Sequence, residues 1–163
     1  MAVKQYIAFN GPSPTTAAQV AVTTGTAIKT LLQIATPSTT DIKVIEWGIS
    51  FDGSSAATPI KVELLQTDVA ATVTSLTPTI WGNPNAPASL CVGGTSATGY
   101  TSTAEGTITA TREFDVQFIA PTNQYMKQFP LGREPWVPVS KFLRVRVTAG
   151  AAVNAYCYVI WEE

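Results

Sequence analysis

The sequence predicts an all-β protein, an antiparallel β-sandwich or barrel with an extended N-terminal arm. Threonine, valine, isoleucine and aromatic residues, which favour strands, are abundant along the chain. Apolar and polar residues alternate over several segments, and connections rich in glycine and proline separate these segments. A helical spacing of apolar residues is hard to find. Together these observations favour packed strands over any helical fold.

One domain is expected, preceded by the arm. A chain of 163 residues buries about two-thirds of its unfolded surface and needs no disulfide or metal to fold. Residues 1–27 are predicted to form the arm, in which Tyr6, Ile7 and Phe9 precede a turn-rich Asn-Gly-Pro-Ser-Pro segment. Residues 28–163 are predicted to form a single sandwich domain.

The first two strands of the domain are predicted from residues 26–35 and 43–52. The first segment has some helical spacing, but its threonine-rich flanks and Pro37 favour a strand. The second shows the clearest alternation in the chain, and the Asp-Gly pair at its end marks a turn. The side chains predicted on its buried face are Ile45, Trp47, Ile49 and Phe51.

Four further strands are predicted at residues 60–66, 107–120, 142–148 and 153–161. Inward-facing side chains are expected to be Phe114, Val116 and Phe118 in the second of these, and Leu143, Val145 and Val147 in the third. Outward-facing ones are expected to be Glu113, Asp115, Gln117, Arg144 and Arg146. The last strand is apolar on both faces, which predicts a central position or a face covered by another subunit.

Two long connections interrupt the predicted strands. Residues 82–106 form a low-complexity stretch that is too long for a simple turn, and they are predicted to be a functional loop or a mobile insertion. Residues 121–140 carry several prolines around Tyr125 and Trp136. Aromatics held by prolines can anchor a partner, although packing within the protein's own domain is the simpler expectation.

The charge content argues against two classes of partner. Charged residues make up 13% of the chain, and 10 basic residues are balanced by 11 acidic ones without forming runs. A nucleic-acid-binding protein needs a basic stripe that displaces counterions from phosphates. No apolar run approaches the ~18–20 residues of a membrane helix, and the start of the chain shows no signal-peptide pattern. We therefore expect no nucleic-acid or membrane partner, and a protein that stays in the cytoplasm where it is made.

Histidine is absent, which removes the commonest general base and the commonest metal ligand. A Ser-His-Asp triad and a His-Glu-x-x-His zinc site are therefore impossible. Cys91 and Cys157 are too few for a four-thiolate site and are expected to be inert thiols. Glu113 and Asp115 lie on a predicted outer face, where acids more often solubilise than catalyse. No catalytic, metal-binding or cofactor-binding residue is predicted, and an enzyme is the least favoured class.

Four segments of the chain resemble small head proteins of tailed bacteriophages. They are VIEWGISFDGS (44–54), PIKVELL (59–65), FLRVRV (142–147) and YVIWEE (158–163). The resemblance extends over residues 40–66 and 107–163 and carries no catalytic signature. It implies a capsid decoration, or cement, protein with a jelly-roll fold, which binds the outer surface of an assembled shell without enzyme activity.

The resemblance also implies partners. These are the major capsid protein and further copies of the chain, with a homotrimer favoured, on the capsid surface of a virion made in the host cytoplasm. The arm is expected to add a strand to an open sheet edge of a neighbour. The predicted contact residues are Tyr6, Ile7, Phe9, Tyr125 and Trp136. Two alternatives stay open: a carbohydrate-binding module that displays Trp81, Tyr100 and Trp136, and a structural protein of the tail.

Overall fold

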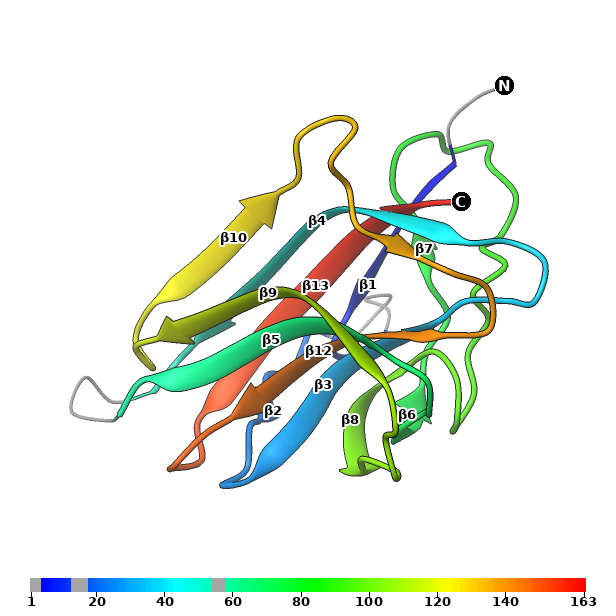
Figure 1. Ribbon diagram of the computed structural model, residues 1–163. Coiled ribbons are helices and arrows are strands. Elements are labelled where there is room, and N and C mark those ends of the chain that lie inside the picture. The colour runs from blue at the N-terminus through cyan, green and yellow to red at the C-terminus, as the bar shows by residue number, and fades with distance from the viewer. Residues whose placement is uncertain (1–3, 13–17, 54–57) are drawn as a thin grey trace.

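Two antiparallel β-sheets packed face to face make up the computed structural model (Figure 1). The structure describes residues 4–12, 18–53 and 58–163, and within them it contains strands and no helix. The predicted all-β sandwich is confirmed. The strands are β1 (Gln5–Phe9), β2 (Val22–Thr23), β3 (Ile28–Ala35), β4 (Ile42–Phe51), β5 (Ile60–Thr67), β6 (Thr72–Ser75), β7 (Thr79–Ile80), β8 (Gly99–Ala104), β9 (Thr111–Ile119), β10 (Gln124–Gln128), β11 (Trp136–Val137), β12 (Phe142–Thr148) and β13 (Asn154–Glu162).

The seven-stranded sheet has the order β10-β4-β13-β1-β7, with β11 also paired to β4 and β2 to β13. The six-stranded sheet has the order β6-β8-β3-β12-β5-β9. The chain crosses between the sheets after β9, so the edge strands β9 and β10 lie on the same side of the sandwich (Figure 1). The jelly-roll topology stays a prediction.

The space between the sheets is filled by apolar side chains from both of them. The predicted inward direction of Leu143, Val145 and Val147 is confirmed, since all three are buried in the core. The last strand, which is apolar on both faces, also has the central position expected of it, because β13 lies between β4 and β1 in the seven-stranded sheet. The largest fully buried apolar side chains of the core are those of Trp47, Trp161, Tyr6, Leu31, Leu32 and Ile34.

The N-terminal segment does not form a free arm. It forms β1, which pairs with β13 over its whole length and with β7 on its other side. Tyr6 is fully buried and Ile7 is 6% exposed, so neither is available to another molecule. The prediction of an arm over residues 1–27 is therefore wrong for this segment, because its apolar residues complete the protein's own sheet. Residues 1–3 and 13–17 of the predicted arm lie outside the described residues.

A β-bulge at Ile45 changes which residues of β4 face the core. The pairing with β13 shifts at this point, so Ile45 has no partner residue on that strand. Val44 is fully buried in the core, whereas Ile45 is half-buried. The predicted inward direction is confirmed for Trp47, Ile49 and Phe51 but is wrong for Ile45.

A second bulge, at Phe114, reverses which side chains of β9 face the core from residue 115 onward. The register with β5 shifts so that Phe114 is skipped, and the alternation resumes in the opposite phase. Asp115 therefore turns inward and is 8% exposed, whereas Phe118 is 73% exposed. The predicted directions of Asp115, Val116, Gln117 and Phe118 are wrong for this reason.

Arg144 on β12 points away from the core, as predicted, but it does not face solvent. Its side chain is fully buried on the outer face of the six-stranded sheet. Nη1 donates a 2.9 Å hydrogen bond to the carboxylate of Glu105, and Nη2 donates to the carbonyl of Val69. Two segments that cross this face thus cover the guanidinium and neutralise it.

The long connection predicted at residues 82–106 ends in β8 and is fastened to the C-terminal end of β13. The hydroxyl of Tyr6 donates to the carbonyl of Pro87 at 2.9 Å. The carboxylate of Glu163 accepts hydrogen bonds from the Ser89 hydroxyl and, at 2.9 Å, from the amide of Leu90. These contacts favour an ordered loop over the mobile insertion.

Candidate interaction surfaces

The five predicted contact residues do not form one surface. Tyr6 and Ile7 lie inside the protein, and Tyr125 is half-buried between the sheet edges. Phe9 is half-buried on the outer face of the seven-stranded sheet, and Trp136 is 51% exposed. Two of the five, Phe9 and Trp136, are therefore able to contact a partner directly.

Tyr125 is a structural link between the two sheets. Its ring packs against that of Trp47 with 5.5 Å between centroids, and its hydroxyl donates a 2.9 Å hydrogen bond to Asp115 on β9. Burial and the bond to Asp115 raise the pKa of Tyr125 to about 12. Lys127 adds an ion pair to the same carboxylate at 3.4 Å. The edge strands β9 and β10 are thus joined across the sandwich.

The sheet edges are poorly suited to pairing with another chain. The nine-residue strand β9 carries a bulge and an inward-pointing acid, Asp115, and β10 carries Lys127. Bulges, inward charges and lysines are devices that discourage edge-to-edge pairing. On the other side of the sandwich β6 has four residues and β7 has two. These features disfavour pairing of either sheet edge with a strand of another chain.

The outer face of the six-stranded sheet is charged. Glu63 pairs with Lys61 at 2.6 Å and with Arg146 at 3.1 Å. Burial would raise the pKa of Glu63, but the hydrogen bonds from Arg146 and Lys61 outweigh it and lower the pKa to about 2. The hydrogen bond to Glu63, together with burial, raises the pKa of Glu113. The ionic groups of this face are therefore largely paired with one another.

A pH-dependent contribution to stability follows from Glu63. Its pKa in the folded protein is about 2, against an ordinary value of 4.5. The ion pairs therefore stabilise the fold fully above pH 4.5 and lose their contribution as the pH falls toward 2. Glu63→Gln should be less stable than wild type at pH 7, and this difference should shrink between pH 4.5 and 2 in urea denaturation. Glu134→Gln is the control, and an equal difference for Glu63→Gln at both ends of this range would contradict the assignment.

A row of side chains crosses the outer face of the seven-stranded sheet and has a tryptophan at each end. Register pairs join Trp136 to Lys43, Lys43 to Glu162 and Glu162 to Gln5. The amide of Trp81 extends the ladder by donating to the carbonyl of Gln5 at 2.8 Å. Directly paired residues project to the same face, so Trp136, Lys43, Glu162 and Gln5 share it, and Trp81 joins their end through its backbone hydrogen bond to Gln5. We call this set the tryptophan row.

The two tryptophans of the row are well exposed, Trp81 at 55% and Trp136 at 51%. Four strand spacings of about 4.8 Å separate them, or about 19 Å in total. The Nζ of Lys43 lies 4.6 Å from the centroid of the Trp136 ring, which orients that ring by a cation–π contact. The third aromatic of the predicted carbohydrate trio, Tyr100, is on β8 of the other sheet and packs against the core. The trio therefore does not form one site.

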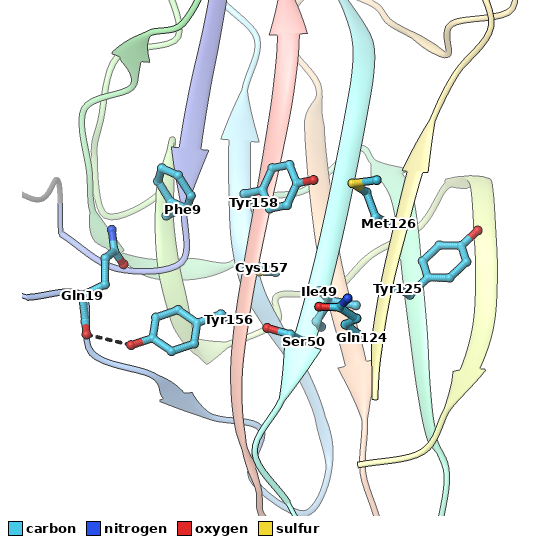
Figure 2. A pocket seen from close by; sticks show the side chains of 10 residues that line it. All are labelled: Phe9, Gln19, Ile49, Ser50, Gln124, Tyr125, Met126, Tyr156, Cys157 and Tyr158. Atoms are coloured by element: carbon cyan, nitrogen blue, oxygen red, sulfur yellow. Dashed lines mark hydrogen bonds between the residues drawn. The ribbon is translucent and has the colours of Figure 1, made fainter. Parts of the chain in front are cut away.

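A groove of about 320 Å³ lies on the same outer face, nearer the N-terminal end of β13 (Figure 2). Figure 2 shows Phe9, Tyr158 and Met126 across its upper part and Tyr156, Ser50 and Gln124 across its lower part. No Asp, Glu, Lys or Arg residue is among those that line it. We call it the aromatic groove.

Gly48 on β4 sets the shape of the aromatic groove. It lies opposite Tyr158, and a Cβ atom there would be 2.6 Å from a carbon of the Tyr158 ring. The glycine thus lets this ring lie across β4, where its hydroxyl donates a 2.5 Å hydrogen bond to Glu46. The hydroxyl of Tyr156 is held in turn by the carbonyl of Gln19 at 2.7 Å.

The possible metal ligands in the described part of the chain include acidic side chains and two free thiols. No three of its Cys, Asp and Glu side chains gather where they could hold a metal ion. Cys91 and Cys157 are both buried, and burial raises the pKa of each thiol well above its ordinary value. None of the described segments is a helix of the length and apolar character needed to cross a bilayer.

No protein-family model, curated protein or solved structure matches this chain. The interpretation of the two surfaces therefore depends on their geometry and chemistry.

Proposed function

We propose that the protein is a non-enzymatic structural protein of a tailed-bacteriophage virion, which decorates an assembled capsid and stabilises it. The tryptophan row is the surface proposed to bind the major capsid protein on the outside of the shell. The observation that carries this proposal is the pair of exposed tryptophans, Trp81 and Trp136, at the two ends of this row. Exposed tryptophans of this kind are typical anchors of protein interfaces.

Two further exposed apolar side chains lie in the segments on either side of β11. Leu131 is 97% exposed in the turn before β11, and Val139 is 41% exposed just after it. Grouped apolar side chains in a protein with few charges favour association with another protein. Lys43 and Glu162 lie between the tryptophans and provide charges of both signs that can fix the orientation of a partner.

The proposed oligomer is a homotrimer. Three copies of the row on one particle would engage neighbouring capsomers together, and the effective concentration would strengthen contacts that are weak singly. Light scattering should then give three times the 17.3 kDa mass of one chain.

The capsid proposal predicts the result of a binding experiment. The double variant Trp81→Ala/Trp136→Ala should lose most of its co-sedimentation with empty expanded capsids, because each anchoring tryptophan contributes about 2 kcal/mol. Phe118→Ala is the matched control, since Phe118 is exposed on the other sheet. Wild-type binding by the double variant would contradict the proposal, and co-purification with tails instead of heads would favour the tail alternative.

A further inference from the structure

The aromatic groove has polar groups that the protein itself leaves unused. Within the described structure the Ser50 hydroxyl and the Gln124 side-chain amide make no hydrogen bond. Figure 2 shows Ser50 and Gln124 beside each other, with the ring of Tyr156 extending from β13 on the opposite side, toward Gln19. A ligand that brings hydroxyl groups to these positions would satisfy them.

The charge of the aromatic groove restricts the ligand to a neutral one. Its lining has no ionisable acid or base apart from phenol and thiol groups. The adjacent carboxylate of Glu46 already accepts a hydrogen bond from the hydroxyl of Tyr158. An ionic ligand would lose hydration on entering without meeting an opposite charge.

The position of the aromatic groove disfavours an extended peptide. Its floor includes β4 and β13, which are paired with neighbouring strands on both sides. Peptides that bind sheets in extended form depend on unpaired backbone groups at an edge strand. On this floor a ligand meets aromatic rings, amide groups and hydroxyl groups instead.

From these observations we infer that the aromatic groove binds a neutral saccharide of one or two sugar rings. A sugar ring has an apolar C–H face, which fits against the rings of Tyr156 and Tyr158, and hydroxyl groups at its rim, which reach Ser50 and Gln124. The volume of about 320 Å³ lies in the range of small-ligand sites, roughly 300–1,000 Å³. The inference does not depend on capsid binding by the tryptophan row.

The test uses the full chain and NMR titration with cellobiose, maltose, N,N′-diacetylchitobiose and, as a charged probe, glucuronate. At least one neutral disaccharide should shift the amide signals of β4, β10 and β13, and glucuronate should not. Tyr156→Ala and Gln124→Ala should each weaken this binding roughly tenfold. Gln124 is exposed on an edge strand, so its replacement leaves the core unchanged.

Trp136→Ala is the matched control, because it changes an aromatic of the same sheet outside the groove. It should leave saccharide binding unchanged, whereas Tyr156→Ala should leave capsid binding unchanged. Failure of all neutral probes, equal binding of glucuronate, or undiminished binding by both groove variants would overturn the inference. Light scattering that shows a dimer dissociated by Tyr156→Ala would also overturn it, since a second copy would then fill the groove.

Discussion

Replacing Glu105 with alanine is expected to destabilise the fold by about 3–5 kcal/mol, because it removes the carboxylate that neutralises a buried guanidinium. Arg144 is fully buried, and the carboxylate of Glu105 accepts its 2.9 Å hydrogen bond. The same carboxylate also accepts a 2.6 Å hydrogen bond from the backbone amide of Thr30. The variant therefore leaves the guanidinium without its counter-charge, and the Thr30 amide keeps only its 3.1 Å hydrogen bond to the Ser102 hydroxyl. Urea denaturation at pH 7 measures the loss.

The double variant Glu105→Ala/Arg144→Met distinguishes the stability lost from an unpaired buried charge from the stability lost with side-chain packing. Methionine fills much of the volume of arginine without a charge, so the double variant should be more stable than Glu105→Ala alone. Arg133→Ala removes an exposed arginine and should change stability little. A loss below about 1 kcal/mol for Glu105→Ala would show that the pair contributes no more than a surface ion pair.

Alternation in the sequence predicted most strands of the domain and the inward faces of several. It predicted β12 well because that strand keeps one phase for the three residues that enter the core, Leu143, Val145 and Val147. It failed at Ile45 in β4, and beyond Phe114 in β9, because a bulge in each strand inserts one residue and inverts the phase of the alternation. The residues at a bulge carry no signal in their own alternation, since the shift is defined by the partner strand.

The tryptophan row and the aromatic groove depend on which residues of distant strands are paired. The alternation of residues within one segment carries no information about that pairing. Trp136 was predicted as a contact residue from its prolines, but its place at the opposite end of a row from Trp81 follows from the pairing of β11, β4, β13, β1 and β7. The burial of Arg144 likewise depends on segments that are distant in sequence. The buried position of Tyr6 was missed because an apolar segment near a chain end suits an arm and a strand equally well.

Trp47→Ala is expected to destabilise the protein by about 3–5 kcal/mol, whereas Trp136→Ala should change its stability by less than about 1 kcal/mol. Trp47 is fully buried in the core and packs against Tyr125, so its removal leaves a cavity and loosens the link between the sheets. Trp136 is 51% exposed and contacts Lys43 at the surface. Thermal and urea denaturation of both variants measure the difference.

Trp47→Phe separates the contribution of the packed aromatic ring from that of the indole N–H group. The indole Nε1 is buried without a hydrogen-bond partner in the described structure, so phenylalanine removes an unsatisfied donor while keeping an aromatic ring against Tyr125. Trp47→Phe should therefore lie nearer to wild type than to Trp47→Ala. Equal losses for both variants would mean that the indole forms a hydrogen bond in solution, and equal losses for Trp47→Ala and Trp136→Ala would place Trp47 outside the core. The contrast matters for the tryptophan row, because a stable Trp136→Ala protein allows lost capsid binding to be assigned to the surface and not to unfolding.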